Sequence, residues 1–318
     1  MALNIIRFEK DGTPAWGLVR NGMISVIDGD YPTTRAFIAT FSNDTAKLAA
    51  LPDGTIAEDA VTLLSPVTRD SRFVCQGANY EQHMIDSGMN PDDKNFNMIF
   101  TKATSCLAPA DTDVIRPKVV QLLDYEIELG IIMKQDITSP QNVTRENLGD
   151  YIAAVTIVND VSARDIQIPQ MQFYKGKSFR TFGPCGPYLT LLEPGDIDQI
   201  EQLDLLLTVN GETRQKDNTA NLVFKPAETL TELSSVQDFA VGDLIATGTP
   251  SGCALSAPSA GKQKIAGLLP EAKKWDMFIK MQLKRPQYLQ PGDKMETSIR
   301  SADGAIDLGV QRNTIVQG

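Results

Sequence analysis

The sequence predicts a mostly β fold of the α+β class, in which strands outnumber short helices. Residues 152–158 (IAAVTIV) form an unbroken apolar and β-branched run, which is typical of a strand buried on both faces. An Asn-Gly pair at 210–211 separates two strand-like segments, which predicts a hairpin over 203–217. A short helix is expected over 226–236, because that segment opens with proline.

Residues 1–65 are expected to form a small N-terminal domain, and residues 66–318 a larger C-terminal one. Over 3–28, an Asp-Gly pair and an Asn-Gly pair lie between strand-like segments, which is the turn chemistry of tight hairpins. Apolar residues recur at helical spacing over 33–51, until Pro52 stops the pattern. These patterns predict an α+β arrangement for the N-terminal domain.

The start of the C-terminal domain predicts a strand over 72–75 and a helix over 80–87. His83 and Asp86 are three residues apart on that helix, so their side chains can face each other. The polar residues 89–97 predict a loop, and a histidine beside such a loop resembles a lid over a site. The alternative is a histidine on a helix surface.

The last third of the chain contains a strand, a helix and a strand pair. Residues 241–252 predict a strand that runs into a turn, whose N–H groups and Thr249 hydroxyl can face an anionic ligand. Residues 257–286 are rich in lysine and carry an apolar stripe around Trp275, which predicts an amphipathic surface or interface helix. Two short strands are expected after Pro291.

Charge and composition exclude several classes of partner. The formal net charge is −10 without a basic stripe, which argues against nucleic acid. The first eight residues lack a signal-like apolar core, and no apolar run approaches the roughly 20 residues that span a bilayer. The four cysteines are scattered without C-x-x-C, which predicts reduced thiols in a cytoplasmic protein. With one histidine, His83, a multi-histidine metal site within one chain is excluded.

Three carboxylates suggest a metal site. Glu126 and Glu128 stand two apart in an apolar run, so on a strand they project to the same face, and Asp160 follows the run at 152–158. Buried carboxylates are normally paired or bound to metal, and three of them suit Mg²⁺, Mn²⁺ or Ca²⁺. The alternatives are exposed acids on an edge strand, or partners for arginine and lysine.

The basic residues that follow do not form a nucleotide site. Gly176-Lys177-Ser178 is not a P-loop, because Met171 stands where a glycine is required. The chain also lacks G-x-G-x-x-G and G-x-S-x-G. Without further context, Arg164 could form an ion pair with Asp165 or a neighbour, and Lys177 could be a solvated loop charge.

Six motifs occur in a fixed order from about residue 64 to the C-terminus. They are GANYEQH (77–83), LDYEIELGIIM (123–133), NDVSARDIQ (159–167), KGKSFRTFGPCGPY (175–188), TGTPSG (247–252) and PGD (291–293). In this order they resemble the fumarylacetoacetate hydrolase superfamily. The resemblance implies a mixed β-sandwich or barrel-like catalytic domain over 66–318, a small N-terminal α+β domain, and a homodimer.

The resemblance also implies roles for individual residues. A divalent ion, Mg²⁺ or alternatively Mn²⁺ or Ca²⁺, would be held by Glu126, Glu128 and Asp160. The catalytic group would comprise His83 as general base, Asp86 beside it, and Lys177. A small oxo-acid substrate would be bound by Arg164, Gln167 and Thr249.

The implied function is metal-dependent hydrolysis of a carbon–carbon bond in a 1,3-dicarbonyl acid, such as an acylpyruvate or β-diketone acid, through a metal-bound enolate in aromatic compound breakdown. The same site also supports a decarboxylase, hydratase or isomerase acting on a 2-oxo diacid such as oxaloacetate. A non-catalytic metal-binding module is a third class, but it would not need His83, Arg164 or Lys177.

The chain departs from family patterns at three places. Asn79 stands where fumarylacetoacetase has a further acidic metal ligand, which argues against fumarylacetoacetate as substrate. Asp86 stands where decarboxylase and acylpyruvase members often have glutamate. The segment 253–286 is longer than in many relatives, so a different roof over the cavity is expected.

Overall fold

The computed structural model describes residues 2–86, 89–94, 96–256 and 269–318. The strands are β1 Leu3–Lys10, β2 Thr13–Arg20, β3 Met23–Ile27, β4 Ile56–Ala57, β5 Thr62–Leu64, β6 Phe73–Gly77, β7 Met98–Thr101, β8 Leu107–Ala108, β9 Val114–Arg116, β10 Leu123–Asp124, β11 Ile127–Met133, β12 Ile152–Asn159, β13 Ser162–Ala163, β14 Gly183–Pro184, β15 Tyr188–Leu191, β16 Leu203–Val209, β17 Glu212–Asn218, β18 Leu244–Ala246, β19 Lys294–Ser301 and β20 Asp307–Gln317. The α-helices are α1 Thr34–Phe41, α2 Thr45–Ala49, α3 Glu81–Asp86, α4 Arg164–Gln170, α5 Phe173–Lys177, α6 Pro226–Ser234 and α8 Glu271–Gln282. Short 3-10 helices are η1 Glu58–Ala60, η2 Pro91–Asp93, η3 Thr104–Cys106, η4 Leu148–Asp150, η5 Ile197–Glu201 and η6 Thr219–Asn221.

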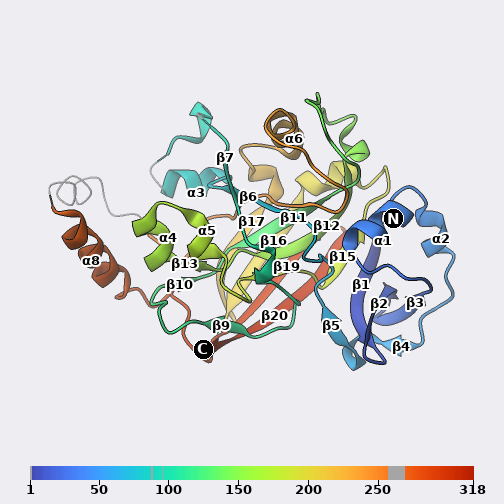
Figure 1. Cartoon of the computed structure of the whole chain (residues 1–318), viewed down its shortest axis with the longest axis horizontal. Helices are drawn as coiled ribbons and strands as arrows, with labels where there is room; N and C mark the ends of the chain where they lie inside the picture. The colour runs from blue at the N-terminus through green and yellow to red at the C-terminus, as the bar shows by residue number, and fades with distance from the viewer. Residues whose placement is uncertain (1, 87–88, 95, 257–268) are drawn as a thin grey trace.

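Two mixed sheets form the body of the molecule (Figure 1). The larger sheet has 11 strands, in the order β4-β3-β2-β1-β15-β12-β11-β18-β6-β7, with β5 paired to β1. The smaller sheet has five strands, in the order β17-β16-β19-β20-β9. The mostly β fold is confirmed, and neither sheet closes into a barrel within the described residues.

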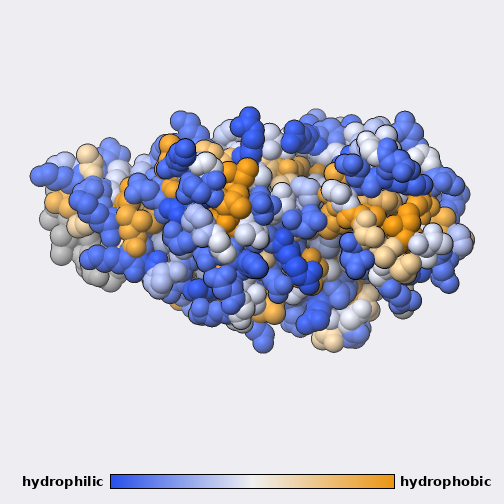
Figure 2. Space-filling model, turned by 90° about the horizontal axis from the view of Figure 1, so that it is seen from below, coloured by the Kyte–Doolittle hydropathy of each residue, from blue (hydrophilic) through white to orange (hydrophobic). Residues whose placement is uncertain are grey.

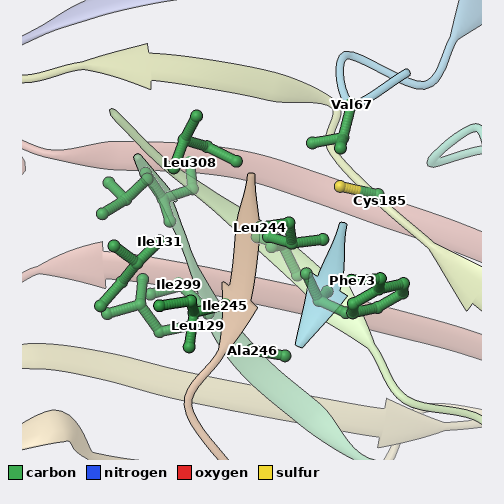
Figure 3. Packing of buried hydrophobic residues seen from close by; sticks show 14 of the residues in the cluster. Val67, Phe73, Leu129, Ile131, Cys185, Leu244, Ile245, Ala246, Ile299 and Leu308 are labelled. Carbon is green, nitrogen blue, oxygen red and sulfur yellow. The ribbon is translucent and has the colours of Figure 1, made fainter. Parts of the chain in front are cut away.

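The core lies between these two sheets, as in a β-sandwich. Figure 3 shows Leu129 of β11 and Leu244 of β18 from the larger sheet packed with Ile299 of β19 and Leu308 of β20 from the smaller one. β11 and β12 are buried along their whole length. Their nearly continuous apolar sequences fit this position, because both faces of the strands are covered.

The N-terminal strands extend the larger sheet. Asp11, Gly12, Asn21 and Gly22 all have positive φ, so the two predicted hairpin turns are confirmed. The predicted helical segment forms α1 and α2. β1 pairs with β15, which joins the N-terminal strands to the sheet that carries β11 and β12. The domain boundary after residue 65 stays a prediction.

Other elements differ from expectation mainly in length. The hairpin across 210–211 and the helix at 226–236 are confirmed as β16–β17 and α6. The strand expected from 241 is only β18, because the following residues form a turn. The C-terminal strands β19 and β20 have 8 and 11 residues and are not short, because each pairs along its length within the smaller sheet.

Two further expectations concern the surface. The helix predicted over 257–286 forms as α8, and residues 257–268 lie outside the described residues. On α8, Phe278 is buried and Met277 is exposed. Figure 2 shows a mostly hydrophilic face with separate hydrophobic patches. The homodimer stays a prediction.

Two predicted absences can be compared with the structure. All four cysteines are buried with free thiols, as expected. Among the described residues, no helix combines the length and the apolar character that crossing a membrane requires.

We expect Ile157→Ala to lower the free energy of unfolding by about 2–5 kcal/mol, because the substitution leaves a cavity in the central strand β12. Ile157 is fully buried, whereas the control Val236 is 72% exposed. Val236→Ala should change stability by less than about 0.5 kcal/mol. Urea denaturation measures both, and equal effects would contradict this description of the core.

Candidate metal centre

The first two predicted ligands lie where one strand gives way to the next. β10 ends at Asp124 and β11 begins at Ile127, so Glu126 precedes the strand and only Glu128 lies within it. The expectation that both glutamates share one continuous strand is therefore wrong. The Glu126 N–H donates to the Asn159 side chain at 3.1 Å, which takes this peptide out of the regular ladder.

Asp160 reaches the same place from the end of β12. β12 runs antiparallel to β11, with Asn159 opposite Ile127. The Asp160 N–H then donates to the Glu126 carbonyl oxygen at 2.8 Å. The start of β11 and the end of β12 therefore deliver acidic side chains to a single point.

The three predicted metal ligands form a compact buried triad of carboxylates. Glu126, Glu128 and Asp160 each place one carboxylate oxygen within 4.8 Å of the others. Their exposed fractions are 5%, 1% and 0%. An all-oxygen donor set suits hard divalent cations such as Mg²⁺, Mn²⁺ and Ca²⁺. The residues present therefore fit a divalent ion.

Three basic side chains surround the triad. Arg164 Nη2 lies 2.5 Å from Glu126 Oε1, and Lys177 Nζ lies 2.6 Å from Glu126 Oε2. Lys177 also donates to one oxygen of Asp160, and Lys102 donates to the other. The alternative that these acids are partners for arginine and lysine is thus also realised in the structure.

The charges in the centre are not evenly balanced. Burial opposes ionisation of Glu126, but Arg164 and Lys177 outweigh it and hold the pKa of this carboxyl well below its usual range. No ion pair within the described ranges reaches Glu128. Burial, together with the charges of Asp160 and Glu126, raises the pKa of Glu128 well above its usual range. A further cation would therefore stabilise the ionised triad.

Two of the predicted substrate ligands lie beside each other at the start of α4. Arg164 is 3% exposed, and its Nη1 donates to Gln167 Oε1 at 2.8 Å. Arg164 Nε donates to Asp124 Oδ2 at 2.8 Å. Asp165 accepts backbone N–H groups from residues 121 and 122. The alternative of an ion pair for Arg164 is therefore realised with other acids and not with Asp165.

His83 is partly buried on α3 and is not paired with its predicted partner. Asp86 accepts hydrogen bonds from Gln82 Nε2 at 2.9 Å and from the Ser251 hydroxyl. Over the residues that the structure describes, no hydrogen bond or ion pair joins His83 to Asp86. Burial lowers the pKa of His83, and the charge of Glu126 opposes the shift only in part. The imidazole is therefore mostly neutral at pH 7.

The turn after β18 is fastened to the start of β11. The Thr249 hydroxyl donates to the Ile127 carbonyl at 2.9 Å and accepts from Gln215 Nε2 at 2.8 Å. The Gly248 N–H donates to Glu128 Oε2 at 2.9 Å. The turn thus positions a triad member, and contact of Thr249 with substrate stays a prediction.

The sequence and this centre match a known enzyme family. The family model described as fumarylacetoacetate hydrolase, C-terminal, matches residues 72–316, which contain every residue of the centre. The chain belongs to the fumarylacetoacetate hydrolase family. The resemblance carried by the six motifs is thereby confirmed.

Relatives within the fumarylacetoacetate hydrolase family carry different chemical names. The oxaloacetate tautomerase YisK of Bacillus subtilis is 33% identical over 242 residues, which are 75% of this chain and 70% of that protein. A fumarylacetoacetate hydrolase structure from Exiguobacterium antarcticum has a TM-score of 0.74 and 27% identity, covering 99% of this chain and 100% of that one. A Mycobacterium abscessus structure with the provisional name 2-hydroxyhepta-2,4-diene-1,7-dioate isomerase has a TM-score of 0.75 and 25% identity, covering 100% and 99%.

Asn79 has a structural task that an acidic ligand could not perform. Its Nδ2 donates to the carbonyl oxygens of Phe224 and Thr247 at 3.1 and 2.8 Å, and its Oδ1 accepts the Phe224 N–H at 2.8 Å. A carboxylate here would face two carbonyl oxygens without a proton to donate. In this member of the fumarylacetoacetate hydrolase family, Asn79 therefore fastens two segments together.

Sequence reasoning missed two buried charged residues of the centre. Asp124 accepts the Arg164 side chain and also the N–H groups of residues 254 and 255, at 2.7 and 3.0 Å. Lys102 binds Asp160 from the end of β7. The available signals were an aspartate two residues before Glu126, and a lysine that closes an apolar strand-like segment.

We expect Asn79→Asp to lower the free energy of unfolding by about 1–3 kcal/mol, because two buried carbonyl groups lose their donor. Asn43→Asp adds the same charge at an exposed position and should be nearly neutral. Chemical denaturation compares the stability of the two variants, and Mn²⁺ titration compares their affinity for the ion. A gain in Mn²⁺ affinity without loss of stability would show that position 79 is a ligand position after all.

Proposed function

We propose that this protein is a divalent-metal-dependent enzyme that interconverts the keto and enol forms of a 2-oxo diacid such as oxaloacetate. The observation that carries the proposal is the buried triad of Glu126, Glu128 and Asp160, whose oxygen donors fit a divalent ion. His83 adds a candidate base, because burial lowers the pKa of its imidazole. A base that activates water is typically oriented by a third group. Asp86 was expected to orient His83, but it accepts hydrogen bonds from other residues, which favours a reaction without an attacking water. The 33% sequence identity between this chain and an oxaloacetate tautomerase supports the same reaction class.

The metal ligands in this proposal are Glu126, Glu128 and Asp160. A bound divalent ion would supply Lewis acidity that stabilises negative charge developing on a substrate oxygen. Arg164 is suited to a substrate carboxylate, because its planar guanidinium can form parallel hydrogen bonds with two oxygens. Burial opposes the charge of Arg164, but its acidic neighbours outweigh burial and raise its pKa, so it stays cationic.

His83 performs the proton transfer in this scheme. The neutral imidazole accepts a proton from C3 of the keto acid and delivers it toward the 2-oxo oxygen, which gives the enol. The reverse sequence returns the proton to C3. No water is consumed and no carbon–carbon bond breaks, so the step needs a base but no positioned nucleophile.

A carbon–carbon bond hydrolase acting on an acylpyruvate is the second candidate. The likeness to a fumarylacetoacetate hydrolase structure at 27% identity favours it. In that reaction His83 accepts a proton from water, and Lys177 and Gln167 stabilise the oxyanion that forms. Decarboxylation of oxaloacetate is the corresponding lyase reaction, and it needs no attacking water.

The proposed function can be tested with purified protein and saturating Mg²⁺. Three rates are compared: decay of enol-oxaloacetate absorbance, CO₂ release from oxaloacetate, and cleavage of an acylpyruvate. We expect enol decay to be accelerated most. Acylpyruvate cleavage with no effect on the enol would favour the hydrolase, and no acceleration of any reaction would refute both candidates.

Metal removal should abolish turnover. Chelation by EDTA should eliminate the accelerated rate, and Mg²⁺ or Mn²⁺ should restore it. Glu126→Gln should reduce kcat by at least about 10²-fold, because charge stabilisation by the ion is a transition-state effect. The control Glu296→Gln alters an exposed carboxyl and should keep the rate. Circular dichroism checks the fold, and full activity of the chelated protein would contradict the metal role.

The pH dependence of kcat should report His83. Because burial lowers its pKa from the ordinary value of about 6.5, the neutral base is present at pH 7 and is lost as the pH falls. With saturating metal, activity should be level near pH 7 and fall on the acid side, with a midpoint below about 6.5. His83→Ala should lose about 10²–10⁴-fold in kcat. An unchanged rate in this variant would exclude His83 as the base.

A further inference from the structure

Two buried lysines contact the acidic triad in different ways. Lys102 and Lys177 both donate to Asp160, each to a different carboxylate oxygen. Their side chains are 0% and 3% exposed. Their other contacts differ: over the described ranges, the hydrogen-bond acceptors of Lys177 are all carboxylates, whereas Lys102 also has a neutral acceptor.

Lys102 is anchored by neutral groups as well as by charge. Its Nζ donates to the Phe182 carbonyl at 2.7 Å and lies 5.6 Å from the centroid of the Phe73 ring. Its backbone N–H donates to the Phe73 carbonyl at 3.1 Å. Lys102 therefore keeps a hydrogen-bond partner and a fixed backbone even if the charge of Asp160 is shared with a metal ion.

Lys177 has no neutral hydrogen-bond acceptor among the described residues. Its Nζ donates to Glu126 Oε2 at 2.6 Å and to Asp160, and it lies 5.0 Å from the centroid of the Phe100 ring. It is also the last residue of α5, a helix of five residues. An ammonium group thus already bridges two of the three carboxylates that fit a divalent ion.

A bound ion would weaken this bridge through charge repulsion and competition for the same carboxylates. A divalent cation held by Glu126 and Asp160 would compete with Lys177 for their carboxylate charge, and it would repel the ammonium at short range. The centre comprises four buried acids, Asp124, Glu126, Glu128 and Asp160, and three buried bases, Lys102, Arg164 and Lys177. Fully ionised, they sum to −1, and a divalent ion would change the sum to +1. One cation would then be available for an anionic ligand.

We propose that Lys102 is a fixed counter-ion of the triad, whereas Lys177 is an exchangeable one that a divalent ion displaces from Glu126 and Asp160. The released ammonium can then bind an anionic group of the substrate, a consequence that rests on the proposed function. Metal binding and exposure of Lys177 are therefore coupled, so the ion binds before the substrate anion.

Amine labelling tests this coupling without any substrate. The full-length protein is treated briefly with acetic anhydride, with and without saturating Mn²⁺, and peptide mass spectrometry measures acetylation of each lysine. Lys177 should be protected without the ion and react at least about tenfold faster with it. Lys102 is the internal control and should stay protected in both states. Equal protection of Lys177 in both states would overturn the proposal.

A second measurement uses metal affinity. Lys177→Met removes the internal cation that the ion must displace, so isothermal titration calorimetry should show at least about tenfold tighter Mn²⁺ binding than in the wild type. Lys175→Met removes an exposed charge from the same helix and should bind within about twofold of the wild type. Unchanged or weaker binding by Lys177→Met would contradict displacement. If that variant does not fold, labelling of the wild type decides.

These outcomes separate this inference from the proposed reaction. Metal-dependent release of Lys177 in a protein without activity on 2-oxo acids would support the exchange and refute the proposed function. Activity on oxaloacetate with Lys177 protected in both states would support the function and refute the exchange. Absence of Mn²⁺ binding would refute both.

Discussion

Four acidic and three basic side chains meet in the buried interior, and the surrounding structure depends on how their charges are balanced. Transfer of one ion from water to a protein interior costs several kcal/mol even after relaxation. Each of these groups therefore needs a partner at short range. The antiparallel pairing of β11 with β12 brings the acids together, and α4, α5 and the end of β7 supply the cations.

The same acids also hold the loops that border the centre. Asp124 accepts two backbone N–H groups just after Cys253, Glu128 accepts the N–H of Gly248, and Lys102 connects Asp160 to the Phe182 carbonyl. A substitution in the triad therefore affects loop order as well as metal affinity. For this reason kinetic changes in such variants are informative only beside a measurement of folding.

Local chemistry was predictable from the sequence, and contacts between distant segments largely were not. The hairpin turns and the helix opened by proline match the structure, because their determinants lie within a few residues. The triad was predictable because motif order indicated a family whose strands bring Glu126 and Asp160 together. The contacts of Lys102 with Asp160 and Phe182, and of Asp86 with Ser251, depend on segments from far along the chain, which no local pattern encodes. The break between β10 and β11 at Glu126 was missed because the Glu126 N–H donates to the Asn159 side chain and not to a backbone carbonyl of the neighbouring strand.

The central claim is that the triad is a site for a divalent ion, and anomalous diffraction from crystals soaked in Mn²⁺ tests it most directly. The account predicts one strong anomalous peak in contact with the carboxylates of Glu126, Glu128 and Asp160, with the Lys177 ammonium withdrawn from them. A peak elsewhere, or Lys177 still bridging Glu126 and Asp160 in fully soaked crystals without a peak at the triad, would contradict it.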